Sequence, residues 1–221
     1  MDRKREIYVH TDVEANGPIP GPFSLWSIGS VAMQADKTIV SYFSANLLDL
    51  PGAGRDPQTT EFWARNPEAY VKARRDARDP LEVMEDYADW LKELPGRPVF
   101  VGSPVGFDFL FVRWYFIYFL GYCPFGHSAL DLRSFAMPIL GRPFFHSGKR
   151  RMPAHLRVKA PHTHVSVEDA LEQGLIWSNL YDHARRLREQ AGALVHPPPD
   201  VDVPLLLTPE LTYNFAPELL Q

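Results

Sequence analysis

The order of hydrophobic patterns along the first half of the chain limits the folds it can adopt. Three runs with strand character come before any helical pattern, at residues 6–14, 24–33 and 39–46. They are followed by an amphipathic helix pattern, a short apolar strand pattern and a strongly apolar helix, at 80–94, 97–103 and from about 107. The order βββαβα predicts an α/β fold, in which helices pack on a mixed sheet.

The remaining segments complete this organisation. A short helix is expected near Thr60, a short helix or strand–helix junction at 128–140, and a strong final helix at about 166–190. Residues 195–221 are rich in proline and show no clear period. We therefore expect one domain at residues 1–194 and a proline-rich tail at 195–221, which is either extended over the body of the protein or a neighbouring subunit, or partly disordered.

Composition excludes several classes of protein. The formal net charge is −4, which argues against an extended basic face on duplex nucleic acid. Cys123 is the single cysteine, so an internal disulfide and a multi-cysteine zinc site are both impossible. The charged start of the sequence predicts no secretory signal, and a cytoplasmic location is expected. The apolar run 107–121 contains Asp108 and Arg113 and is short for a membrane span, which favours a buried helix and no membrane association.

Two carboxylates in the first strand stand out. Asp12 and Glu14 are two residues apart, so a strand directs them to the same face. Neighbouring carboxylates repel each other and are unfavourable to bury without a partner. Acidic residues at a strand end before a Gly/Pro turn are often simply solvated. A functional role for Asp12 and Glu14 is indicated only when two later sites in the sequence are considered with them.

The first later site is Asp108, at the start of the apolar helix. A carboxylate is favourable there through the helix dipole alone, but it is also well placed to bind a metal. The second is the pair His164 and Asp169. Ser166 and Asp169 have the spacing of a capping box, which is the structural alternative. His162-x-His164 resembles half of a zinc site, but no third soft ligand lies at a suitable spacing.

These motifs resemble a known family when they are taken in order. The set comprises Asp12-x-Glu14, Asp108 and His164-x4-Asp169. It is similar to the DEDDh branch of the 3′–5′ exonucleases, which includes the proofreading subunit of DNA polymerase III, oligoribonuclease and ribonuclease T. The resemblance extends from about residue 6 to 185. The sequence departs from the family at two supporting positions, where Pro104 replaces a common Asn and Ser166 a common Ala.

The resemblance implies an RNase H-like fold with a five-stranded mixed sheet. It also implies two divalent metal ions, Mg²⁺ or Mn²⁺, held by Asp12, Glu14, Asp108 and Asp169. Four converging carboxylates cannot all stay ionised without cations, and oxygen ligands suit these metals. His164 would accept a proton from water, since an unperturbed imidazole has a pKa near 6.5. The implied reaction releases nucleoside 5′-monophosphates from single-stranded 3′ ends, with RNA slightly preferred, and a homodimer is implied by several relatives.

Aromatic and basic residues are candidates for binding substrate. Phe107, Phe62, Trp63 and Trp26 lie near the expected site or in the segment that could cover it, with core packing as the alternative. Lys149 and Arg150 begin a basic loop that also contains Arg151, Arg157 and Lys159, which either contacts phosphate or is solvated. We expect Lys72, Arg74, Arg75 and Arg78 to be exposed charges without a specific role.

Two other functions remain open from the sequence. A non-catalytic RNase H-like binding module would keep the fold but would not need four converging carboxylates. A phosphodiesterase acting on small nucleotides would use the same chemistry in a tight pocket closed by residues 47–66, whereas an open groove would favour the exonuclease.

Overall fold

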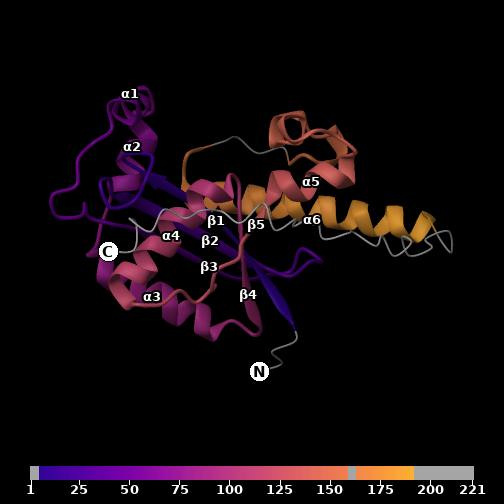
Figure 1. Ribbon diagram of the computed structural model, residues 1–221, viewed down its shortest axis with the longest axis horizontal. Helices are drawn as coiled ribbons and strands as arrows, with labels where there is room; N and C mark the ends of the chain where they lie inside the picture. The colour runs from indigo at the N-terminus through magenta and orange to yellow at the C-terminus, as the bar shows by residue number, and fades with distance from the viewer. Residues whose placement is uncertain (1–4, 159–162, 192–221) are drawn as a thin grey trace, which may run out of the picture. The chain divides into compact units, whose positions relative to one another are not determined.

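The central feature is a five-stranded mixed sheet. The computed structural model describes residues 5–158 and 163–191 (Figure 1). The strands are β1 (Glu6–Ala15), β2 (Leu25–Met33), β3 (Ile39–Asn46), β4 (Arg97–Gly102) and β5 (Leu130–Asp131), in the spatial order β3-β2-β1-β4-β5. The pairs β1–β2 and β2–β3 are antiparallel, and β1–β4 and β4–β5 are parallel. The predicted mixed sheet is confirmed.

Six helices accompany the sheet within the described residues. They are α1 (Pro57–Arg65), α2 (Pro67–Arg74), α3 (Pro80–Glu93), α4 (Val105–Leu120), α5 (Leu132–Leu140) and α6 (Ser166–Ala191). Single turns of 3₁₀ helix follow α5, at Phe144–His146, Lys149–Arg151 and Ala154–Leu156. The sequence did not predict α2, because it begins one residue after α1 ends and its eight residues are too few to show a period.

The two faces of β1 have different partners. The odd-numbered Ile7, Val9 and Val13 belong to the core formed with α3 and α4. Tyr8 and His10, on the even-numbered face, contact Trp177 of α6, with ring centroids 4.1 and 5.4 Å apart. Asp12 and Glu14 continue this face toward the end of the strand, as the alternation predicted.

The apolar helix is α4, and it is buried against the sheet as expected. Its residues Phe111, Val112, Tyr115 and Phe116 are fully buried. No helix in the described part of the chain is both long and apolar enough to cross a bilayer. The predicted domain boundary at residue 194 and the tail 195–221 lie outside the described residues.

Close backbone approach fixes the start of α6 on the sheet. Gly29 pairs with Asp12 across β1 and β2, and a Cβ atom at Gly29 would overlap the backbone of Ser166 and Val167. The hydroxyl oxygens of Ser27 and Ser166 are 2.8 Å apart. The first turn of α6 is therefore held directly beside Asp12.

Replacing Gly29 with Ala is expected to destabilise the protein by about 1–3 kcal/mol, the usual range for overpacking. The overlapping atoms are backbone and cannot rotate away, so the start of α6 must shift. Urea unfolding measures the loss, and the catalytic rate should fall with it. Gly106→Ala is the matched control, because a Cβ atom there meets nothing within 4 Å. Equal stability of G29A and wild type would contradict this account of helix docking.

Candidate active site

Four carboxylates from three different elements gather at one edge of the sheet. Asp12 and Glu14 come from the end of β1, Asp108 from the first turn of α4, and Asp169 from the first turn of α6. Asp108 and Asp169 are only 2% and 1% exposed, and Asp12 and Glu14 are partly buried. The structure therefore brings together the four acidic residues that the motifs selected.

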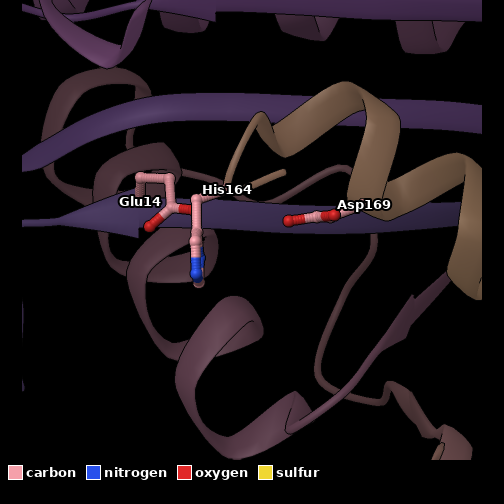
Figure 2. A group of neighbouring side chains, drawn as sticks. All are labelled: Glu14, His164 and Asp169. Atoms are coloured by element: carbon pink, nitrogen blue, oxygen red, sulfur yellow. The ribbon is translucent and has the colours of Figure 1, made fainter. Parts of the chain in front are cut away.

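Glu14, His164 and Asp169 form the tightest group. One side-chain ligand atom of each lies within 4.8 Å of the other two, and Figure 2 shows the three side chains, with Asp169 extending from the start of α6. His164 Nδ1 is 3.9 Å from Glu14 Oε1. An imidazole next to carboxylates can act in acid–base chemistry and can also be oriented by them.

Burial and mutual repulsion raise the pKa values of several carboxylates in the cluster. Burial raises the pKa of Glu14 to about 8, and the charges of Asp169 and Asp108 add to the effect. The pKa of Asp12 is also raised well above its usual value. Burial is the largest cause, and the negative charges of Asp108, Glu14 and Asp169 add to it. The cluster thus holds more negative charge than this buried site accommodates.

Asp108 is positioned by the strand-to-helix junction. Burial raises its pKa to about 7, although the backbone N–H groups of Ser103 and Val13 act in the opposite direction. The Ser103 N–H donates to Asp108 Oδ2 at 3.0 Å. Asp131, which the sequence analysis missed, accepts from the Val105 N–H at 3.2 Å and fixes the start of α4. Its only sequence signal was its place inside the segment 128–140, where a short helix or strand–helix junction was expected.

The segment before α6 places His164 and Asp169. His164 has a left-handed backbone with φ of 52°, and its ring meets the Phe62 ring edge-on at 5.1 Å. The Thr163 N–H donates to Asp169 Oδ1 at 3.4 Å. The capping-box alternative is wrong, because Ser166 is already the first helical residue and its hydroxyl pairs with Ser27. His162, the other half of the considered zinc motif, lies outside the described residues.

A cavity of about 420 Å³ adjoins the carboxylates. Its walls include Glu14, Asp56, Thr59, Phe62, Trp63 and Phe107, so the structure brings the three aromatic candidates Phe62, Trp63 and Phe107 together. Trp63 is largely buried and its indole N–H donates to the Ala15 carbonyl at 3.0 Å, so only part of it faces the cavity.

Trp26 follows the core-packing alternative rather than the substrate-binding one. Trp26 is 2% exposed and packs in a satellite core with Trp63 and Tyr70, so it is not available to a substrate base. Arg74 also differs from the exposed charge expected of it. Its guanidinium lies over the Trp26 ring, 4.7 Å from the centroid, and donates to the Leu47 carbonyl at 2.9 Å.

The two basic candidates occupy different environments. Lys149 Nζ forms an ion pair with Glu172 Oε2 at 3.1 Å, and both side chains are largely buried. The positive charge of Lys149 also lowers the pKa of Asp12 and Asp108, against the larger effect of burial. Arg150 is exposed. Lys149 therefore borders the carboxylate cluster, whereas Arg150 lies on the surface next to it.

The four carboxylates fit a site for divalent cations. All donors are oxygen atoms, which Mg²⁺ and Mn²⁺ prefer. These carboxylates are buried or partly buried without a matching positive charge, so binding a cation would relieve the repulsion between them. The raised pKa values of Asp12, Glu14 and Asp108 are the structural observation that supports this fit.

The metal-free protein is expected to lose stability as pH rises from about 5 to 8.5. Glu14 and Asp108 have folded-state pKa values of about 8 and 7, above the unfolded values of about 4. Their contribution to stability is therefore complete below pH 4 and is lost as pH rises through 7 and 8. Melting temperatures in EDTA test this, with Mn²⁺ restoring stability at pH 8 and Glu14→Gln reducing the pH dependence. A melting temperature that rises with pH in EDTA, unaffected by Mn²⁺, would contradict the electrostatic account.

The fold and the carboxylate site together define the class of the protein as an RNase H-like exonuclease, and comparisons with known proteins specify its family. No protein-family model matches the chain. The chain is 35% identical over 138 residues to the 3′-5′ DNA exonuclease Cap18 of Escherichia coli, an alignment that covers 61% of this chain and 70% of Cap18.

Solved structures show the same fold. The nuclease domain of 3′hExo, described as a DEDDh family member bound to rAMP, matches with a TM-score of 0.59 at 13% identity, over 86% of this chain and 95% of that one. S. pombe Pop2p in its Mg²⁺- and Mn²⁺-bound form matches with a TM-score of 0.57 at 13% identity, over 78% and 82%. E. coli exonuclease I in complex with a dT13 oligonucleotide matches with a TM-score of 0.60 at 13% identity, over 84% of this chain and 43% of that chain.

The chain belongs to the DEDDh family of metal-dependent 3′–5′ exonucleases, and it is a 3′–5′ exonuclease. This confirms the resemblance that the ordered motifs predicted. It also excludes the alternative of a non-catalytic binding module.

Proposed function

We propose that the protein removes nucleoside 5′-monophosphates one at a time from the 3′ ends of single-stranded DNA. The observation that carries this proposal is the convergence of four buried or partly buried carboxylates and His164 beside a cavity with aromatic walls. The choice of DNA is supported by the similarity to Cap18, which is a DNA exonuclease by name. The slight preference for RNA that the sequence analysis inferred from its family resemblance finds no support in these comparisons.

Asp12, Glu14, Asp108 and Asp169 would hold two divalent cations. Bound Mg²⁺ or Mn²⁺ would balance the carboxylate charge, lower the pKa of the attacking water and stabilise charge on the leaving 3′ oxygen. The Mg²⁺- and Mn²⁺-bound form of Pop2p supports this choice of metals. The protein contributes the rigid placement of these ligands, because Asp12 lies in the sheet and Asp108 and Asp169 lie in helical first turns.

His164 is the proposed general base. Its Nδ1 faces Glu14, so we assign Nε2 as the nitrogen that accepts the proton from the attacking water. Phe62 contacts the edge of the imidazole ring and limits its rotation. Glu14 therefore has two roles in the proposal: it binds metal, and it orients the base.

The cavity beside Glu14 is the proposed site of the 3′-terminal nucleotide. Phe107 and Phe62 offer partly exposed rings for the terminal base, and Trp63 supports them from the core. Lys149, fixed by Glu172 next to the carboxylates, is placed to contact the phosphate, and exposed Arg150 is placed to contact the strand beyond it. Stacking on aromatic rings tolerates any base sequence, which suits a stepwise exonuclease.

A preference of this exonuclease for very short substrates, like those of the small-nucleotide phosphodiesterase considered from the sequence, is a second candidate because residues of α1 line the cavity. Asp56, Thr59 and Phe62 belong to the segment 47–66 that was expected to close such a pocket. A nucleotide pocket with covering walls would serve both reactions, so the assay must include substrates of both lengths.

The test is a time course on a 5′-labelled single-stranded DNA 10-mer, its RNA twin and a DNA dinucleotide, with Mn²⁺ or with EDTA. We expect a metal-dependent ladder that shortens from the 3′ end, faster on DNA than on RNA. Faster cleavage of RNA would overturn the choice of sugar. Cleavage of the dinucleotide without any ladder on the 10-mers would favour the small-nucleotide enzyme.

A further inference from the structure

Two neighbouring phenylalanines between α5 and α6 expose their rings to solvent. Phe145 is 78% exposed and Phe144 40% exposed, and their ring centroids are 5.4 Å apart in an edge-to-face arrangement. Both lie on one turn of 3₁₀ helix, Phe144–His146. We call this pair the Phe144–Phe145 platform. Exposed aromatic rings of this size are unfavourable in water and indicate a binding role when they occur together.

The platform is fixed by contacts around it. Buried Ser147 donates from its hydroxyl to the Pro143 carbonyl at 3.0 Å. The Arg142 guanidinium donates to the Arg151 carbonyl at 2.7 Å and closes the segment into a loop. The Arg133 guanidinium of α5 lies over the Phe144 ring, 5.0 Å from its centroid. A surface that is ordered in advance loses less entropy when it binds a ligand.

The same segment reaches the carboxylate cluster. Lys149 follows Phe145 by four residues and pairs with Glu172, which lies one helical turn beyond Asp169 on α6. Four residues span at most about 14 Å when fully extended. The platform is therefore only a few nucleotides from the place where a 3′ end would be cleaved. Figure 1 shows this segment coiling beside α5 and over α6.

Positive charge flanks the platform. Arg142, Arg150 and Arg151 are exposed on the segment. This local excess of positive charge contrasts with the formal net charge of −4 for the whole chain. Exposed rings interleaved with cations are the chemistry that binds single-stranded nucleic acid, because bases stack on the rings and phosphates pair with the cations.

We propose that the Phe144–Phe145 platform, with Arg150 and Arg151, binds the nucleotides of a single-stranded DNA substrate upstream of the scissile bond. This inference rests on the proposed function and adds to it a subsite that favours longer strands. Phe145 is the main contact because its ring is almost fully available. Phe144 meets the Phe145 ring edge-to-face, and the Arg133 guanidinium lies over the Phe144 ring.

The experiment compares kcat/KM for a dT 10-mer with kcat/KM for a dT dinucleotide that is too short to reach the platform. In Phe145→Ala the ratio of the two is expected to fall about 5-fold or more, the effect of losing one stacked base. Phe145→Trp keeps a ring and is expected to retain the wild-type ratio. Tyr42→Ala is the matched control, since Tyr42 is 69% exposed on β3, away from this segment.

The outcomes separate the two proposals. If the wild type cleaves neither substrate, the proposed function fails. If it cleaves both and the ratio in F145A equals that of the wild type, only the platform is wrong. A change in elution volume of F145A on size exclusion, with the ratio unchanged, would show that a second copy or the chain's own residues 195–221 cover these rings, and would also overturn the proposal.

Discussion

Replacing Asp12 with Asn will lower kcat by about 10³-fold or more, and it will make the metal-free protein more stable. The loss follows because charge stabilisation by a bound cation supplies several kcal/mol, and each 1.36 kcal/mol is tenfold in rate. The gain in stability follows because Asp12 is buried among Asp108, Glu14 and Asp169, whose charges oppose its own. An amide at this position removes one of four repelling charges at nearly constant shape.

The opposite signs of these two effects make the prediction specific. If Asp12 had only a structural role, its substitution would lower the activity and the stability of the protein together. Melting temperatures in EDTA and single-turnover rates in Mn²⁺ measure the two quantities separately. Asp89→Asn is the matched control, because Asp89 is exposed and pairs only with Lys92 among the described residues, and such surface pairs contribute little. Asp169→Asn should also abolish activity, since Asp169 belongs to the same cluster. A D12N protein with near wild-type activity would contradict the metal-binding role.

Replacing His164 with Ala will lower kcat by about 10²–10⁴-fold, the usual contribution of a positioned acid–base group. The carboxylates remain in this variant, so metal binding should persist while turnover falls. The acid limb of the pH–rate profile, which reports the protonation of the base, should disappear in H164A. Ordinary activity in H164A, or an unchanged acid limb, would show that another group accepts the proton.

Glu14→Gln separates the two functions proposed for Glu14. Glutamine keeps an oxygen near His164 but removes a metal-binding charge, so the variant should need more Mn²⁺ for half-maximal rate. Because Glu14 Oε1 is 3.9 Å from His164 Nδ1, the acid limb of its pH–rate profile should also shift. Saturating Mn²⁺ would then restore only part of the rate, and full restoration would show that Glu14 has no role in orienting His164.

The residues of the carboxylate cluster could be selected from the sequence because local geometry determines how each of them is presented. Strand alternation directs Asp12 and Glu14 to one face, and helix starts fix Asp108 and Asp169. Four of the strands and the helices α3, α4 and α6 followed from periodicity in the same way, whereas β5 has only two residues and a fifth strand was implied only by the family resemblance. Local patterns do not show that the segments carrying these residues meet in space. That prediction came from the order of the motifs along the chain.

Features that depend on tertiary packing could not be predicted. Trp26 and Trp63 pack in the same small cluster, but only Trp63 also lines the cavity beside Glu14. The ion pair of Lys149 with Glu172 joins residues 23 positions apart. The exposure of Phe145 was hidden as well, since a pair of phenylalanines in sequence normally indicates core.

Calorimetric titration of the protein with Mn²⁺ at pH 7.5 tests the metal-binding role of the four carboxylates most directly. The account predicts two binding sites per chain in the wild type and weaker binding or the loss of a site in D12N, with Asp89→Asn unchanged. Binding of Mn²⁺ that is the same in the wild type and D12N, or no binding at all, would contradict the claim that the four carboxylates hold the catalytic cations.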